Sequence, residues 1–377
     1  MSAMRDATKT SAGRTVEVVP VQTPSRAYDV HVGVNILDGA GELVRASAGG
    51  SVAAVISDSN VAPLYAERVL ESLRAAGYET ALVTFPAGEE HKRLSTLEVM
   101  LEELANAGLT REDVVVALGG GVTGDMAGLA AAMYLRGIKV AQIPTSLLAM
   151  VDSSVGGKTA VDLAAGKNLA GAFFQPHVVL ADVACLHTLS HELLTDSCGE
   201  IVKHGVLCDP ELFCDICERP VNSADTDDER LARIIARNVA IKRDVVNADE
   251  KERGLRQTLN LGHTLGHAIE AGSNFELGHG SSVAAGLCCV SRAAERLGWA
   301  EPGTTRLIER ACHAHDLPTD TELDHETIFA YATHDKKRRG GTVTLVVPER
   351  IGKVSLRKVT LQELREVIEL GCGTGER

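Results

Sequence analysis

Residues 114–125 read VVVALGGGVTGD, an apolar run that passes straight into a cluster of glycines. Gly119, Gly121 and Gly124 have the spacing G-x-G-x-x-G, which lets a backbone approach a pyrophosphate at the start of a helix. The stretch therefore predicts a buried strand, a tight turn and a helix that bind a dinucleotide. The strand that follows ends without the acidic residue that usually holds the ribose, so Asp58, at the end of an earlier strand, is the candidate.

The segments on either side of this stretch alternate between strand and helix. Strands are predicted at 15–19, 28–32, 52–57, 80–85, 114–118 and 140–143, and helices at 62–76 and 94–107. Continuous apolar strands separated by helices are typical of a mostly parallel sheet with helices on both faces. We therefore predict a flexible tail at 1–14 and an α/β NAD-binding domain at 15–184.

Helical periodicity dominates the second half of the chain. Helices are predicted at 192–206, 227–247, 258–271, 281–297 and 304–315, with one β-hairpin at 342–347 and 353–356. We therefore predict a helical metal- and substrate-binding domain at 185–377.

The composition limits what the protein binds. The chain of 377 residues has 38 Lys and Arg against 51 Asp and Glu, a formal net charge of −13, and 3% aromatic residues. Nucleic-acid binding needs a basic surface or aromatic stacking platforms, so this class is disfavoured. An anionic ligand must instead be held by a local cluster of cations. Neither a secretory signal nor a membrane span is predicted, and we expect a cytoplasmic protein.

The nine cysteines are expected to be reduced thiols, because no export signal precedes them. Cys214 and Cys217 form a C-x-x-C pair, which suggests a metal or redox site. The alternative, which we favour, is two turns of a helix with half-buried thiols.

Glycine-rich loops in the first half predict an anion clamp. Residues 156–159 read GGKT, like the end of a P-loop, but Asp152 stands where that motif needs a glycine. The P-loop interpretation therefore fails. Lys158, Lys167 and Asn168 remain as a clamp for an anion, with solvated surface lysines as the alternative.

The strongest polar cluster lies in the helical half. Glu200 and Lys203 are three residues apart and share one face of a predicted helix. Four polar residues then recur at i, i+4, i+7 and i+11, which predicts one stripe along a single helix: Arg256, Asn260, His263 and His267. A buried polar group without a partner costs about 1–3 kcal/mol, so such a stripe indicates a functional site.

A metal ion is the hypothesis that fits these side chains best. Glu200, His263 and His279 offer one carboxylate and two imidazoles, the ligand number of a catalytic zinc site. His263 and His267 alone resemble the zincin pair, but Thr264 stands where a zincin needs glutamate. Helix caps and surface histidines are the alternative, because most of the thirteen histidines are not ligands.

Taken in order over residues 58–340, these motifs resemble the 3-dehydroquinate synthases of the sugar-phosphate cyclase superfamily. The resemblance rests on PTSLLAMVDSSVGGKT at 144–159, GKNLAGAF at 166–173, GEIVKHG at 199–205, RQTLNLGHTLGHAIE at 256–270, HG at 279–280 and DKK at 335–337. It implies an NAD- and metal-dependent lyase of the shikimate pathway that acts as a homodimer. Such an enzyme converts 3-deoxy-D-arabino-heptulosonate 7-phosphate into 3-dehydroquinate and phosphate, by transient oxidation, elimination of phosphate, re-reduction and aldol closure.

The resemblance also implies roles for individual residues. The implied ligands of zinc or cobalt are Glu200, His263 and His279. The implied phosphate contacts are Lys158, Asn168, Lys203, Asn260, His267 and either Lys336 or Lys337, with Arg136 reaching the partner subunit's phosphate. Lys242 and Arg256 are implied to hold the carboxylate, and Asp152 and Glu252 to contact the hydroxyls or their anchors. The implied NAD contacts are Asp58, Glu89, Lys92, Gly120, Gly121, Val122, Asp125, Thr145, Ser146, Lys158, Lys167 and Thr188. Residues expected to take part in catalysis are Asp152, Lys158, Lys203, Glu252, Arg256, Asn260 and His267.

Three alternatives stay open at this point. An iron-type polyol or alcohol dehydrogenase shares the expected fold, but it has no use for the lysines at 158, 167 and 203. A cyclase for sugar phosphates without a carboxylate has no reason to keep Arg256 beside Lys242. An inactive homologue that only binds nucleotide is the third. Ser190 and His191 stand where the family commonly has Pro and Arg, a difference we expect to be structural.

Overall fold

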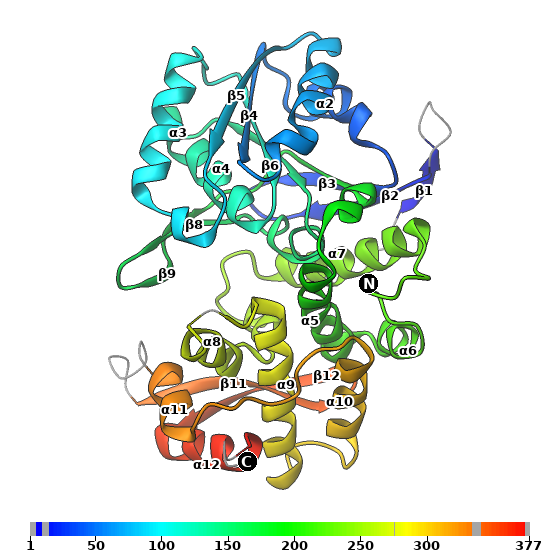
Figure 1. The fold of residues 1–377 in the computed structure, drawn as a ribbon, viewed down its shortest axis with the longest axis vertical. Helices are drawn as coiled ribbons and strands as arrows, with labels where there is room; N and C mark the ends of the chain where they lie inside the picture. Colours follow the sequence, from blue (N-terminus) through cyan, green and yellow to red (C-terminus); the bar gives the residue numbers. More distant parts are fainter. Residues whose placement is uncertain (1–4, 10–14, 275, 334–340, 374–377) are drawn as a thin grey trace. The chain divides into compact units, whose positions relative to one another are not determined.

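The computed structural model describes residues 5–9, 15–274, 276–333 and 341–373, and it forms two compact units (Figure 1). Unit 1 comprises Met1–Leu189 and Asp227–Lys251, and unit 2 comprises Ser190–Thr226 and Glu252–Arg377. The sequence pattern predicts a second domain that comprises all of residues 185–377. The structure instead groups helix α7 (Asp228–Ala248) with unit 1.

Helix α7 joins unit 1 because its apolar face covers the first strands of the sheet. Ile234, Ile235 and Val239 on this helix are buried, and α7 packs against strands β2 and β3. The end of the helix is held by a hydrogen bond from the backbone N–H of Gln22 to Oδ1 of Asn247, at 2.8 Å. An apolar helical stripe only shows that a surface is buried, so the sequence could not tell which unit this helix covers.

A mixed but mostly parallel sheet forms unit 1, as predicted. In the described residues its strand order is β1-β2-β3-β10-β7-β6-β4-β5, and all strands from β3 to β5 in that order are mutually parallel. β1 and β2 add antiparallel at one edge, so residues 5–9 form a strand where a flexible tail was expected. The strands are β1 (Arg5–Lys9), β2 (Thr15–Gln22), β3 (Ala27–Gly33), β4 (Val52–Asp58), β5 (Glu79–Phe85), β6 (Val114–Gly119), β7 (Lys139–Pro144) and β10 (Val178–Asp182).

Each face of this sheet has its own hydrophobic core, because successive strand residues point to opposite sides. Ala53 and Val55 of β4 pack with α1 (Ala40–Ala48) and α2 (Ala62–Ala75). Ala54 and Ile56 pack on the other side, with α3 (Leu94–Asn106) and α4 (Gly121–Met133). Figure 1 shows α2 on one side of the sheet and α3 and α4 on the other. Strand–helix alternation therefore predicted the layers of unit 1 correctly.

Short elements connect these layers. They include η1 (Leu37–Gly39), η2 (Glu89–His91), η3 (Tyr134–Arg136), η4 (Ala149–Ser153) and η5 (Val183–Thr188). A separate hairpin of β8 (Lys158–Leu163) and β9 (Gly166–Phe173) occupies the segment that the sequence analysis treated as glycine-rich loops. Because a strand rather than a helix follows Lys158, the rejection of a P-loop at this place is consistent with the fold.

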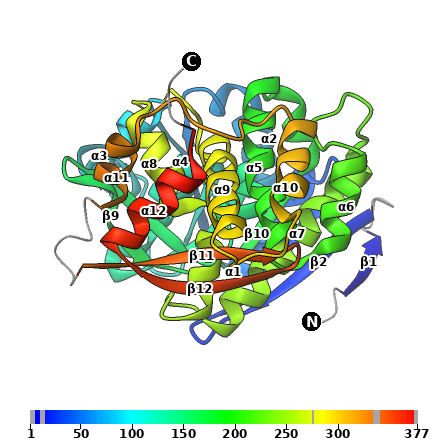
Figure 2. The same cartoon turned by 90° about the horizontal axis from the view of Figure 1, so that it is seen from below.

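Unit 2 is a group of helices around α9. The helices are α5 (His191–Cys208), α6 (Pro210–Glu218), α8 (His263–Gly272), α9 (His279–Arg296), α10 (Thr304–Ala314), α11 (His325–Thr333) and α12 (Leu361–Gly371). β11 (Thr342–Arg350) and β12 (Lys353–Thr360) form the predicted antiparallel hairpin. Helix α9 packs against α5, α8, α10 and α12, which surround it in Figure 2. Ser190 caps α5 by accepting a hydrogen bond from the N–H of Leu193, a structural role of the kind expected for this position.

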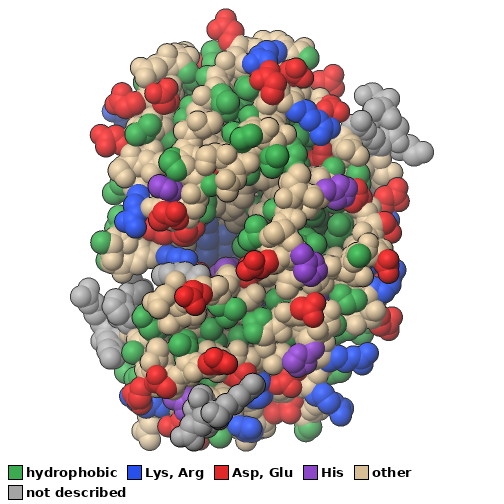
Figure 3. Space-filling model, viewed as in Figure 1, with side chains coloured by type: hydrophobic (Ala, Val, Ile, Leu, Met, Phe, Trp, Pro, Cys, Tyr) green, Lys and Arg blue, Asp and Glu red, His purple; other side chains and the backbone are tan. Residues whose placement is uncertain are grey.

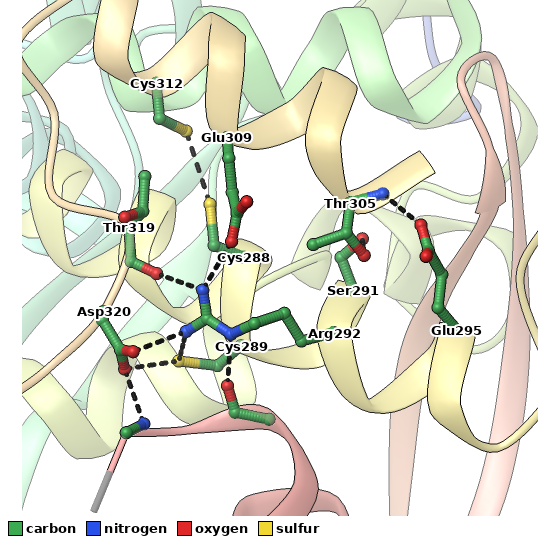
Figure 4. Close-up of polar contacts among 12 residues, drawn as sticks. Cys288, Cys289, Ser291, Arg292, Glu295, Thr305, Glu309, Cys312, Thr319 and Asp320 are labelled. Atoms are coloured by element: carbon green, nitrogen blue, oxygen red, sulfur yellow. Dashed lines mark hydrogen bonds and ion pairs between the residues drawn. The ribbon is translucent and has the colours of Figure 1, made fainter. Parts of the chain in front are cut away.

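Arg292 on α9 ties several segments of unit 2 together, as the close-up in Figure 4 shows. Its guanidinium contacts Glu309 of α10 at 2.7 Å and Asp320 at 3.0 Å, and it donates to the backbone oxygen of Thr319 at 3.0 Å. Its Nε donates to the carbonyl oxygen of Gly371, at the end of α12. One side chain thus satisfies polar groups from three separate parts of the unit.

The cysteines are free thiols. The Sγ atoms of buried Cys288 and Cys312 lie 3.7 Å apart beside the Arg292 network (Figure 4). Cys214 and Cys217 lie on α6, which agrees with the helical interpretation of the C-x-x-C pair. Burial raises the pKa of Cys217 to about 11, which disfavours a reactive thiolate there.

The charges on the surface and the hydropathy of the helices can both be examined in the structure. On the face shown in Figure 3, acidic and basic side chains are interspersed, so a binding site for an anion has to come from a local grouping of cations. No helix among the described residues is both long and apolar enough to cross a membrane.

Replacing Arg292 by methionine is expected to lower the free energy of unfolding by about 2 kcal/mol, because the carbonyl oxygens of Thr319 and Gly371 lose their donor and the partly exposed carboxylates of Glu309 and Asp320 lose their ion pairs. Urea unfolding followed by circular dichroism measures the change. Arg296→Met is the control, since Arg296 is exposed one turn further along α9 and should cost less than about 1 kcal/mol. Equal effects of the two substitutions would contradict this role of Arg292.

Candidate active site

A buried carboxylate on α5 is the centre of the site in unit 2. Glu200 and Lys203 are each 1% exposed, and the Lys203 ammonium lies directly against Oε2 of Glu200. Oε1 of Glu200 lies 3.4 Å from Nε2 of His263 and 3.5 Å from Nε2 of His279. Despite these charged neighbours, neither oxygen of Glu200 has a hydrogen bond of normal geometry within the described residues. The three residues predicted as metal ligands are therefore brought together.

Close packing of two helix backbones places Glu200 beside His279. A Cβ atom added to Gly199 would collide with the carbonyl oxygen of Gly280, so α5 and α9 touch at this point through their main chains. Asp196, one turn earlier on α5, accepts hydrogen bonds from the N–H groups of Gly280 at 3.2 Å and Ser281 at 2.8 Å. It thereby satisfies free donors at the start of α9, directly beside His279.

The polar stripe that was expected on a single helix in fact spans two elements. Arg256 and Asn260 lie on the 3-10 helix η6 (Leu255–Asn260), and α8 begins only at His263. The helical conformation is interrupted at Gly262, whose φ of 77° is left-handed. A Cβ atom added to Gly262 would lie 2.7 Å from the carbonyl oxygen of Val283 on α9. The expectation of one helix over 258–271 is therefore wrong, because a close approach to α9 interrupts it.

The distances in this cluster fit a divalent metal ion. Donor atoms about 2.0–2.2 Å from one tetrahedral zinc ion lie about 3.3–3.6 Å apart, and both measured separations from Glu200 fall within this range. A cation would also satisfy the carboxylate oxygens that lack normal hydrogen bonds. His267 is exposed, and its ring lies 5.1 Å from that of His263, so it borders the same place.

The electrostatics of the cluster also favour a cation. Burial tends to raise the pKa of Glu200, but Lys203 and the two imidazoles hold this pKa well below its usual range. Burial lowers the pKa of His263 to about 3, which keeps this imidazole neutral and able to donate a lone pair. His279 differs, because its contacts with Glu200 and Glu270 outweigh burial and raise its pKa to about 10. A metal ion bound here would displace that proton.

The glycine turn of unit 1 has the predicted strand–turn–helix geometry. β6 ends at Gly119, Gly120 precedes the helix and α4 begins at Gly121. Asp58, at the end of β4, accepts a hydrogen bond from the hydroxyl of Thr123 in the first turn of α4, at 3.0 Å. The structure therefore places this carboxylate beside the first turn of α4, and its contact with a ribose stays a prediction.

A network around Lys92 gathers several of the predicted NAD contacts in unit 1. The Lys92 ammonium lies 2.7 Å from Oδ2 of Asp125 on α4 and 2.6 Å from Oδ1 of Asn168 on β9. Glu89 lies within 4.0 Å of the ammonium groups of both Lys92 and Lys167. The Asn168 amide oxygen thus faces Lys92, and the implied contact between Asn168 and phosphate stays a prediction.

The remaining predicted residues lie as follows. Nζ of Lys242 is 2.8 Å from Oδ1 of Asp152 in unit 1, and Nδ2 of Asn260 donates to Oε1 of Glu252 at 3.1 Å in unit 2. Arg256 is 1% exposed. The others are Arg136 in η3, Val122 on α4, Thr145 and Ser146 after β7, Lys158 at the start of β8 and Thr188 at the end of η5. Lys336 and Lys337 lie outside the described residues.

Sequence reasoning missed two residues of this site. Asp196 has no signal in the sequence, because its hydrogen bonds join helices far apart along the chain. Glu270 accepts a hydrogen bond from His279 and lies seven residues after His263, which is two helical turns and the same face of α8. That spacing is the signal in the sequence that points to Glu270.

Comparison with known proteins identifies close relatives. Residues 82–196 match the family described as 3-dehydroquinate synthase N-terminal, and residues 197–338 match 3-dehydroquinate synthase C-terminal. The 3-dehydroquinate synthase of Streptococcus pneumoniae is 40% identical over 352 residues, which is 93% of this chain and 99% of the relative. The similarity therefore extends over both units.

Solved structures of related cyclases are similar as well. A 2-deoxy-scyllo-inosose synthase complexed with carbaglucose-6-phosphate, NAD+ and Co2+ has a TM-score of 0.82 and 26% identity, over 94% of this chain and 100% of that chain. The 2-epi-5-epi-valiolone synthase of Streptomyces hygroscopicus, with NAD+ and Zn2+ bound, has the same TM-score and identity, over 91% and 96%.

Adding a methyl group at Gly199 is expected to separate α5 from α9 and to move Glu200 away from His279. Gly199→Ala should lower the free energy of unfolding by about 3 kcal/mol or more, since backbone atoms cannot turn aside as a side chain can. It should also weaken zinc binding measured by competition with a chromophoric chelator. Gly39→Ala is the control, because an added Cβ there meets no atom within 4 Å. Unchanged zinc binding in folded Gly199→Ala would contradict this account.

Proposed function

The chain belongs to the 3-dehydroquinate synthase family, and from this premise we propose that it converts 3-deoxy-D-arabino-heptulosonate 7-phosphate into 3-dehydroquinate and phosphate. The observation that carries the proposal is the cluster of Glu200, His263 and His279, whose spacing fits one metal ion beside the buried ammonium of Lys203. The dehydrogenase and carboxylate-free cyclase alternatives are not better supported.

We propose NAD and a divalent metal ion, zinc or cobalt, as cofactors. The two cyclase structures with NAD+ and either Co2+ or Zn2+ support this choice, as do the glycine turn and the donor set of this chain. When bound, NAD supplies reversible hydride acceptance, and the metal ion supplies Lewis-acid polarisation of the substrate hydroxyl. The oxidation is reversed later in the reaction, so no net NADH forms.

The residues of the chain have separate proposed tasks. Glu200, His263 and His279 hold the metal ion, and Lys203 supplies positive charge beside it. Asn260, whose amide donates to Glu252, is held in place to contact the substrate. His267 is exposed beside the cluster and passes a proton between phosphate and solvent. The leaving phosphate can itself remove the proton during elimination, so no further protein base is needed.

The other implied contacts are proposals as well. Asp58, the Gly120–Val122 turn, Thr145, Ser146, Thr188 and the network of Glu89, Lys92, Asp125 and Lys167 are proposed to bind NAD. The proposed substrate contacts are Asp152, Lys158, Asn168, Lys242, Arg256 and one of the two lysines Lys336 and Lys337. We further propose a cytoplasmic homodimer, in which the exposed Arg136 reaches the phosphate bound to the partner subunit.

Phosphate release tests the proposed reaction directly. The purified protein should release phosphate from 3-deoxy-D-arabino-heptulosonate 7-phosphate, lose this activity with a metal chelator and regain it with zinc or cobalt. Substoichiometric NAD should suffice, without accumulation of NADH. Preferential turnover of glucose 6-phosphate or sedoheptulose 7-phosphate would instead favour a carboxylate-free cyclase, and net NADH formation from glycerol would favour a dehydrogenase.

Arg256→Met is expected to weaken binding of the substrate carboxylate. A charge-assisted hydrogen bond contributes about 1.5–3 kcal/mol, so KM for the heptulosonate phosphate should rise about 10- to 150-fold. Arg253→Met is the control, because Arg253 is exposed and has no assigned role. An unchanged KM in a folded Arg256→Met enzyme would show that Arg256 does not hold the carboxylate.

A further inference from the structure

We propose that Glu270 is a positioning residue, which orients His279 for a divalent metal ion. The inference rests on the proposed function, since it assumes that Glu200, His263 and His279 share such an ion. Neither the resemblance nor the comparisons assigns a role to Glu270. Its side chain is not itself a ligand in this proposal and acts only through the imidazole of His279.

The contact geometry supports this role. Glu270 is 8% exposed on α8, and its Oε2 lies 3.2 Å from Nδ1 of His279. The other ring nitrogen of His279, Nε2, lies 3.5 Å from Oε1 of Glu200. The imidazole thus lies between two carboxylates, with one nitrogen toward each. A hydrogen bond from Nδ1–H to Glu270 fixes the tautomer and leaves the lone pair of Nε2 on the side of Glu200.

The second histidine of the site is oriented differently. Nδ1 of His263 lies 3.1 Å from the carbonyl oxygen of Leu261, so the backbone next to it accepts its proton. His279 is the first residue of α9, and its ring is 32% exposed against 14% for His263. The more exposed ligand therefore has a side chain as its partner, and this partner can be changed by substitution.

One helix supplies both a ligand and the partner of another ligand. His263 and Glu270 are seven residues apart on α8, so they share a face two turns apart. This face lies against α9, because an added Cβ at Gly266 would come within 2.9 Å of the carbonyl oxygen of Ser282. Such tight backbone packing limits how far Glu270 can shift relative to His279.

Zinc affinity of the apoprotein tests the proposal without relying on activity. Outer partners of metal-bound histidines typically contribute about 10- to 100-fold to affinity. Glu270→Ala should therefore raise the zinc dissociation constant by about that factor, in competition with a chromophoric chelator. Glu270→Gln keeps an acceptor of the same length, so it should retain more of the affinity than Glu270→Ala. Glu276→Gln is the control, since Glu276 is an exposed carboxylate between α8 and α9.

A spectroscopic readout separates positioning from a structural role. The visible absorption bands of the Co2+-loaded protein should shift in Glu270→Ala, because the imidazole is no longer held in one orientation, and should stay unchanged in Glu276→Gln. If Glu270→Ala does not fold, Glu270→Leu, which keeps much of the side-chain volume and removes the acceptor, takes its place in both measurements. Zinc affinity within twofold of wild type and an unchanged cobalt spectrum in the folded variant that lacks the acceptor would overturn the proposal. Failure of the wild-type protein to bind zinc or cobalt would overturn the metal site of the proposed function as well.

Discussion

A negatively charged side chain that lies almost wholly out of water is the constraint on which unit 2 depends. Removing a carboxylate from water costs several kcal/mol unless charges and hydrogen bonds compensate. Glu200 is 1% exposed, and its oxygens have no hydrogen bond of normal geometry to any part of the chain that the structure describes, while Lys203 and two imidazoles face it. A carboxylate in such surroundings is suited to a cation that completes its coordination. The position of this one group thus explains why cationic and neutral donors converge on it from three helices.

Backbone contacts, rather than long side chains, set the positions of these helices. α5 meets α9 at Gly199 and Gly280, and α8 meets α9 along Gly262 and Gly266. Main-chain contacts leave little room for adjustment, because there is no flexible side chain to yield. Metal sites need their ligands held to within about 0.5 Å, and packing of this kind is suited to that need.

The sequence predicted those features that depend on local pattern. Continuous apolar segments separated by helical segments predicted the parallel strands of unit 1. The spacing of Gly119, Gly121 and Gly124 predicted the turn into α4. Contacts between segments that are far apart along the chain could not be predicted from the sequence. Gly262 interrupts the expected helix only because α9 lies against it, and the side of α7 that is buried does not reveal which unit it covers. The β8–β9 hairpin was missed because its glycines indicate loops as readily as strands.

The path of the chain through the two units has a consequence for synthesis. α7 belongs to unit 1, although residues 190–226 of unit 2 precede it along the chain. On the ribosome, the sheet of unit 1 therefore cannot acquire its last covering helix until part of the other unit has already emerged. A truncation after residue 189 would expose the apolar surface of β2 and β3 that α7 covers. Neither unit can be expressed intact from one continuous segment of the gene, because each consists of two segments of the chain.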